Sequence, residues 1–197
     1  MITIQELHAR GIYIDCLRFF LCPNRPLKDP LPMTIITRGA LYIPDNATHK
    51  VKDLVNKIIF DSCTRYIGDR AFYECTKVKT LKLPEGLLEI GEKAFQGLWR
   101  VPFLKIPSTV VDIGKGAFSG MGSLSIMSIP SSLKIIREET FLECYSLLEV
   151  NIPSSVKEIR SNAFKGCSGL SNVYLSKTTK VATDAFSGCP HVKFIYR

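Results

Sequence analysis

The sequence predicts a β-rich (α/β) solenoid, in which a short unit repeats along the chain and each unit adds one coil. Phe72, Phe95, Phe118, Phe141 and Phe164 are each 23 residues apart, and Phe186 follows after 22. A fixed period of about 20 to 29 residues is typical of proteins in which every coil adds a short strand to a growing sheet. The period predicts about six units over residues 58–197.

Each unit keeps apolar residues at fixed distances from its Phe. Five residues before Phe stand Ile67, Ile90, Ile113, Ile136, Ile159 and Val181. Nine residues after Phe stand Leu81, Leu104, Met127, Val150, Val173 and Ile195, within an L-x-x-L-x-L core that matches the leucine-rich-repeat template. One coil cannot bury these residues alone, so the pattern predicts that stacked coils form apolar ladders along the molecule.

Two short strands are expected in each unit. The alternation in L-x-L has the period of a half-buried strand, and a Pro without an amide donor ends that strand. The prolines in question are Pro84, Pro107, Pro130 and Pro153. A second apolar pair, such as Leu87 and Ile90, predicts another strand on the opposite side of the coil. Gly68, Gly91 and Gly114 are expected to allow a tight corner before Phe.

The consensus resembles the BspA-type leucine-rich repeat over roughly residues 58–197. Its A-F-x-G-C turn stands nearly whole at 163–167 and at 185–189. The resemblance implies a curved, right-handed leucine-rich-repeat coil with two short strands per unit, found in surface and secreted proteins of bacteria and protists. Some of those proteins attach to host proteins, and the resemblance implies no catalysis.

Residues 1–57 break the rhythm and are expected to form an irregular, partly helical N-terminal capping segment. Counting back 23 residues from Phe72 gives His49, with no Ala before it, so no regular unit is expected there. Residues 50–57 carry apolar residues on one helical face, and residues 3–11 have capping-box spacing. Residues 23–32 hold four prolines and predict an extended connection. A separate small domain is the alternative interpretation.

Composition favours one elongated, folded domain. The 197 residues are 46% apolar and 22% charged, with a net charge of +8 that divides as +3 over residues 1–60 and +5 over 61–197. Acids are interspersed among bases, which predicts a solvated surface and no nucleic-acid partner. The apolar stretch 12–21 contains two charges and is too short for membrane insertion. Without a signal-peptide pattern the chain as written is expected to be cytoplasmic, with secretion or the cell surface as the alternative implied by the resemblance.

The cysteines are expected to pack in the core rather than to hold a metal. Cys75, Cys144, Cys167 and Cys189 share a column with Leu98 and Met121, which marks an apolar position. A bridge between Cys144 and Cys167, on adjacent coils, stays open. Zinc-site spacing and catalytic motifs are missing, so no metal, no cofactor and no enzymatic activity are expected.

Strand alternation predicts an outward face on the principal sheet, the one formed by the L-x-L strands. The expected partner-binding residues on it are Lys82, Phe103, Lys105, Ile126, Glu149, Asn151, Tyr174, Phe194 and Tyr196. Exposed aromatic and polar side chains favour a non-catalytic protein–protein interaction module, adhesin-like or scaffold. The alternative is a structural, self-associating repeat fragment of a larger surface protein. Because the last unit stops at Arg197, an open C-terminal end at Val192, Phe194 and Ile195 predicts a homo-oligomer.

Overall fold

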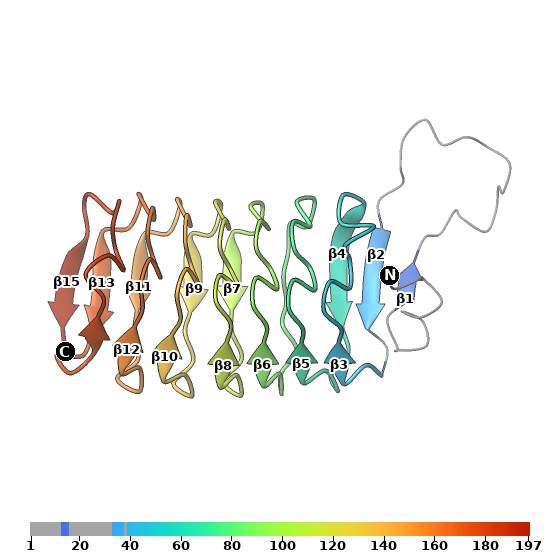
Figure 1. Ribbon diagram of the computed structural model, residues 1–197, viewed down its shortest axis with the longest axis horizontal. Helices are drawn as coiled ribbons and strands as arrows, with labels where there is room; N and C mark the ends of the chain where they lie inside the picture. Colours follow the sequence, from blue (N-terminus) through green and yellow to red (C-terminus); the bar gives the residue numbers. More distant parts are fainter. Residues whose placement is uncertain (1–12, 16–32, 38) are drawn as a thin grey trace, which may run out of the picture.

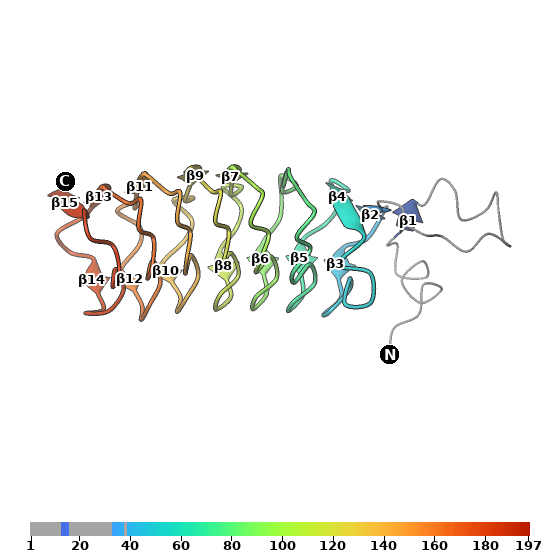
Figure 2. The same cartoon turned by 90° about the horizontal axis from the view of Figure 1, so that it is seen from above.

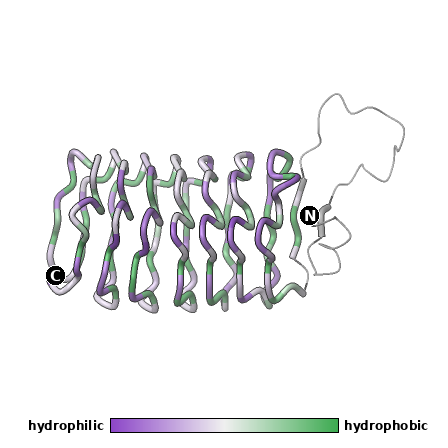
Figure 3. Tube along the Cα trace, in the orientation of Figure 1, coloured by the Kyte–Doolittle hydropathy of each residue, from purple (hydrophilic) through white to green (hydrophobic). Residues whose placement is uncertain are grey.

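The computed structural model describes residues 13–15, 33–37 and 39–197. In this part the chain forms an elongated solenoid of about seven coils stacked along one axis (Figure 1). Hydrophobic and hydrophilic residues alternate around every coil (Figure 3). Most of the apolar ones point inward and form one core that runs the length of the stack. The expected solenoid with units of about 23 residues is therefore confirmed.

One row of strands runs along one side of the coils. It consists of β2 (Met33–Thr37), β4 (Val55–Phe60), β7 (Phe103–Lys105), β9 (Ile126–Ser128), β11 (Glu149–Asn151), β13 (Asn172–Leu175) and β15 (Lys193–Tyr196). We call it the principal row. Its paired neighbours are parallel, while β1 (Tyr13–Asp15) adds to β2 antiparallel. In the coil of Phe72 the expected strand around Leu81 lacks regular pairing, although Leu81 and Leu83 are buried in the core.

A second row of two-residue strands lies on another side of the coils, and Figure 2 separates the two rows. It consists of β3 (Tyr42–Ile43), β5 (Tyr66–Ile67), β6 (Glu89–Ile90), β8 (Asp112–Ile113), β10 (Ile135–Ile136), β12 (Glu158–Ile159) and β14 (Lys180–Val181). All its pairings are parallel. The second short strand that the sequence predicts is thus present in seven successive coils.

A third connection joins the coils at the Ala-Phe corner. The amide of Phe72 donates to the carbonyl of Ala94 in the next coil at 2.8 Å, and Phe141 donates to Ala163 in the same way. The six Phe rings stack with centroids 5.0 to 5.7 Å apart and planes within 17° of parallel. Backbone bonds and ring contacts therefore fix the same register at this corner.

Glycine at this corner has two different functions. Two residues after Phe the backbone adopts positive φ, which glycine tolerates best; Gly97 and Gly166 have φ of 82° and 73°. Glu74 and Glu143 adopt the same conformation with φ of 54° and 59°. Gly91, four residues before Phe, has no such φ, but a Cβ there would lie 2.6 Å from the amide nitrogen of Asp69. The expectation that Gly68, Gly91 and Gly114 allow a tight turn is therefore wrong. Glycine is needed at these positions because the neighbouring coil leaves no room for a Cβ.

The cysteine column lies in the core, as the sequence predicts. Cys75, Cys144, Cys167 and Cys189 are buried free thiols. The Sγ of Cys167 lies 3.2 Å from the carbonyl oxygen of Phe141, so the thiol donates to the coil before it instead of bridging to Cys144. Burial raises the pKa of the Cys75 thiol to about 12, which makes it a packing group rather than a nucleophile.

The expected number of units is one too low. Ile43 pairs with Ile67, and Thr48 takes the place of Phe, because its amide donates to Ala71 at 3.0 Å. This coil is 24 residues from the next, so counting back 23 reaches His49 and misses it. The hydroxyl of Thr48 also donates to the Ala71 carbonyl at 2.9 Å, which suits a polar residue to this position.

The helix expected over residues 50–57 is not formed. Turns lead from Thr48 to Leu54, and strand β4 begins at Val55, where it pairs with Met33 of β2. Eight residues are too few for a stable isolated helix, and pairing along the principal row takes precedence. The helix expected at 3–11 and the connection at 23–32 lie outside the described residues. The capping role of residues 1–57 and the right-handed winding stay predictions.

We expect Phe118→Ala to lower the free energy of unfolding by about 3 to 5 kcal/mol, because the ring is fully buried between Phe95 and Phe141. Urea denaturation followed by circular dichroism measures it. Phe103→Ala is the control, since that ring is 60% exposed and its loss should change stability by well under half as much. Equal effects of the two substitutions would contradict the assigned core.

The thiols give a second expected outcome. Titration of the unfolded protein should count all seven cysteines of the chain as free thiols. A reducing agent should leave the melting temperature unchanged, because the cysteine column packs without bridges. A lower thiol count, together with a melting temperature that falls on reduction, would show that a disulfide forms.

Candidate functional site

The outward face of the principal row carries two large apolar side chains directly beside each other. Phe103 of β7 pairs with Ile126 of β9, and their residues are 60% and 61% exposed. The next residues of the two strands point inward: Leu104 is buried in the core, and Met127 packs against it. Strand alternation places Phe103 and Ile126 outward, as the sequence predicts. The parallel pairing of β7 and β9 brings these two side chains close enough to contact each other.

The polar residues predicted for this face lie mostly where expected. Lys82, Lys105, Glu149 and Asn151 are exposed on the same side of their coils. Tyr174 is half-buried, because the Arg197 guanidinium lies 4.4 Å from the centre of its ring. Arginine over an aromatic face is a favourable contact, and it covers part of the ring that was expected to face solvent.

The expected position of Phe194 and Tyr196 on this face is wrong. In the last pairing Phe194 lies beside Val173 and Tyr196 beside Leu175, both of which are core positions. Phe194 packs edge-on against Phe186 with centroids 5.2 Å apart. The last coil reaches its strand one residue earlier than the repeat, and a shift of one residue exchanges the two faces of a strand. Ile195 consequently takes the outward position beside Tyr174.

Besides Ile59 of β4, which is 40% exposed, three exposed apolar residues in the coils around Phe103 and Ile126 were missed by sequence reasoning. Trp99, Tyr145 and Leu148 are 45%, 50% and 57% exposed. Trp99 and Tyr145 occupy the same column, four residues after Phe, and Gly122 stands between them. The column holds Thr76, Trp99, Gly122, Tyr145, Ser168 and Pro190, so the only signal was an aromatic residue in a column that is otherwise small or polar.

With Phe103 and Ile126 these three residues form what we call the apolar patch. It comes from coils that follow one another, since the amide of Ser123 donates to the Trp99 carbonyl at 2.9 Å and that of Ser146 to the Gly122 carbonyl at 3.1 Å. The backbone under the patch is therefore bonded from coil to coil. Exposed apolar groups gathered in this way are typical of interaction sites.

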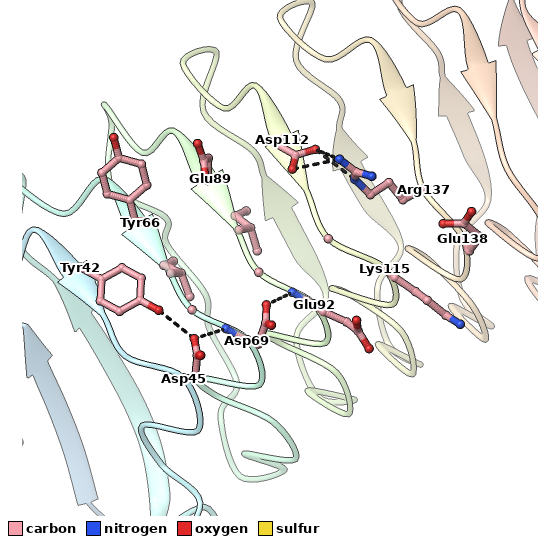
Figure 4. A pocket seen from close by; sticks show the side chains of 15 residues that line it. Tyr42, Asp45, Tyr66, Asp69, Glu89, Glu92, Asp112, Lys115, Arg137 and Glu138 are labelled. Atoms are coloured by element: carbon pink, nitrogen blue, oxygen red, sulfur yellow. Dashed lines mark hydrogen bonds and ion pairs between the residues drawn. The ribbon is translucent and has the colours of Figure 1, made fainter. Parts of the chain in front are cut away.

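A groove of about 550 Å³ crosses the second row on another side of the solenoid (Figure 4). Its acids bond the next coil: Asp45 Oδ1 accepts the amide of Asp69 at 2.9 Å, and Asp69 Oδ1 accepts that of Glu92 at 2.7 Å. The hydroxyl of Tyr42 also donates to Asp45 at 2.8 Å. These carboxylates continue the backbone ladder where it would otherwise lack an acceptor.

The opposite end of the groove is closed by an ion pair. Arg137, which follows β10, donates from Nε and Nη2 to the carboxylate of Asp112 in the preceding coil at 2.9 to 3.1 Å. Gly68, Gly91 and Gly114 also line the groove. Asp45, Asp69 and Asp112 of the groove thus have a structural role, because each of them bonds a neighbouring coil.

Two further observations bear on function. Among residues 13–15, 33–37 and 39–197, no three His, Cys, Asp or Glu side chains are grouped so that they could hold a metal ion. Within the same described residues, no helix has the length and apolarity needed to cross a bilayer.

The chain belongs to the BspA type leucine rich repeat region family. The family profile matches over residues 42–171 and again over 89–196, with six copies of the repeat. The match begins at Tyr42, the first residue of β3, and so includes the coil that counting from Phe had missed. The resemblance seen in the repeat consensus is confirmed. A comparison with curated proteins finds no significant match.

Solved bacterial structures share the fold. A leucine-rich-repeat protein of T. pallidum is 27% identical, with a TM-score of 0.67 over 84% of this chain and 74% of its own. A leucine rich cell surface protein of Faecalibacterium prausnitzii is 20% identical, with a TM-score of 0.60 over 83% of this chain. The match covers 59% of the Faecalibacterium chain, which is less than two thirds of its length.

Proposed function

We propose that this chain is a non-catalytic protein-binding module, adhesin-like or scaffold, that contacts its partner through the outward face of the principal row. The observation that carries the proposal is the direct pairing of Phe103 with Ile126, both about 60% exposed. The core columns explain every buried apolar residue of these coils, but they give no reason for large apolar groups on the outside.

The physical properties of the apolar patch support this proposal. Aromatic side chains are enriched at the centres of protein interfaces, where they bury much area with few rotatable bonds. The backbone of the patch is bonded from coil to coil, so little conformational entropy is lost when a partner docks. Phe103, Ile126 and Trp99 would form the centre, and Lys105, Glu149 and Asn151 would provide a polar rim.

The cellular setting is part of the proposal. We propose that the protein is located at a cell surface, as the family resemblance implies. The Faecalibacterium protein that shares this fold is described as a cell surface protein. Since the match spans 59% of that protein, the attachment and partners of a longer protein stay proposals. The buried cysteine column, held by backbone carbonyls, supports a packing rather than a catalytic use of its thiols.

The test compares the unsubstituted protein with the double variant Phe103→Ser, Ile126→Ser. Each protein is used to capture partners from the native source by crosslinking. We expect the melting temperature to change little, because both side chains are exposed, and partner affinity to fall at least roughly tenfold. Val111→Ser is the control, since Val111 is 53% exposed on the approach to the second row.

Capture of the same partners with unchanged affinity by the double variant would refute the proposed surface. Ultracentrifugation of both proteins covers the alternative function. If the unsubstituted protein forms a concentration-dependent oligomer and the double variant does not, the face serves self-association instead. A variant that unfolds would show that the two side chains belong to the core.

A further inference from the structure

Basic residues gather on one side of two adjacent coils. Segments 76–83 and 99–106 occupy the same place in successive coils, and together they contain five bases and no acid. The five are Lys77, Lys79, Lys82, Arg100 and Lys105, and all are exposed. We call them the basic corner. In the next coil the corresponding segment, 122–129, carries no charge.

The winding of the chain creates this corner. Phe72 and Phe95 stack at 5.5 Å, and the Phe72 amide bonds Ala94, so residues 23 apart lie side by side. Lys77 is therefore next to Arg100, and Lys82 is next to Lys105. Of the acids in the same coils, Asp69, Glu89 and Glu92 line the groove at the second row (Figure 4), and Glu74 pairs with Lys52. Glu85 is the acid of these coils that lies beside the corner, where it reaches Lys105.

The charges of the basic corner are hardly neutralised within the chain. Lys77, Lys79 and Lys82 form no ion pair or hydrogen bond in the part of the chain that the structure describes. Lys105 reaches Glu85 at 2.9 Å, but both side chains are about 70% exposed, so solvent screens the pair. Five close positive charges repel one another, and a negative partner would remove that repulsion.

The corner is joined to the apolar patch. Trp99 and Phe103 come from the same coil as Arg100 and Lys105, and the Arg100 guanidinium lies 4.5 Å from the centre of the Trp99 ring. Beyond this coil the surface continues with Ile126, Tyr145 and Leu148. Along the solenoid axis, a basic half is thus followed by an apolar half.

We propose that the basic corner and the apolar patch together bind an extended acidic polypeptide segment that carries an apolar side chain. The inference rests on the proposed function and names the chemistry of the partner. Paired strands are about 4.8 Å apart, so four coils span about 14 Å, which an extended segment crosses in about four to five residues. Acids would face the lysines, and the apolar side chain would lie against Trp99 and Phe103.

The length of the basic corner favours a polypeptide over a nucleic acid. A nucleic acid carries charge along its whole backbone and is met by a continuous basic stripe. Here the bases end after two coils, the third coil is uncharged in this segment, and the fourth presents Glu149. A polypeptide can change from acidic to apolar within a few residues.

The test uses the fluorescence of Trp99, the single tryptophan of the chain. The probe is a synthetic peptide of about six residues, acidic in its first half and with leucines in its second, and it lacks tryptophan. We expect a saturable change of Trp99 emission at about 50 mM salt that weakens strongly at about 500 mM, as screening predicts. The double variant Lys79→Glu with Lys82→Glu should weaken binding roughly tenfold or more.

The control variant is Lys134→Glu with Lys157→Glu, which makes the same change of net charge on the approach to the second row. It should bind the acidic peptide as the unsubstituted protein does. Equal loss in both variants, or equal binding of a peptide with lysines in place of the acids, would overturn the inference. Tighter binding of an oligothymidylate than of the acidic peptide would overturn it as well, in favour of a nucleic acid.

The two proposals fail separately. If partner capture depends on Phe103 and Ile126 while the acidic peptide does not bind, the chemistry named for the partner is wrong and the proposed function stands. If the peptide binds at the basic corner but no captured protein depends on Phe103 and Ile126, the proposed function fails.

Discussion

The stacking of one coil on the next at the Ala-Phe corner is the interaction on which the rest of the structure depends. From Phe72 to Phe164, the amide of each Phe of the column bonds the following coil, as from Phe95 to Ala117 at 2.8 Å, and its ring stacks on the next ring in the same register. An aromatic contact of this kind contributes about 0.5 to 1.5 kcal/mol beyond burial. Since no coil can bury its core alone, the strands of both rows owe their position to this stack.

The core could be predicted because it repeats, and the departures from it could not, because each changes the repeat by one residue. Ile113 and Phe118 recur at a fixed spacing and were placed correctly. The first coil is one residue longer, which hid Thr48, and the last reaches its strand one residue early, which puts Phe194 beside the core residue Val173 although 40% of Phe194 stays exposed. A one-residue change is barely visible in a sequence, yet it exchanges the faces of a strand.

The candidate surface was only partly predictable for a related reason. Phe103 and Ile126 follow from strand alternation, whereas Trp99 and Tyr145 stand in a corner column whose direction alternation does not give. Charge was also hidden, since Lys82 and Lys105 are far apart in the sequence and become neighbours only when the chain is wound. The core columns stay the same from coil to coil, while the residues in the exposed columns vary. A repeat protein can therefore change the surface that a partner contacts without changing its fold.

Amide hydrogen exchange tests the central claim most directly. If the Ala-Phe corner holds the coils together, the amides of Phe95, Phe118 and Phe141 should exchange only through global unfolding, and all with the same free energy. The amide of Arg100, for which no backbone acceptor is found in the described chain, should exchange much faster. Fast exchange at the three Phe amides, with protection confined to the principal row, would contradict the account.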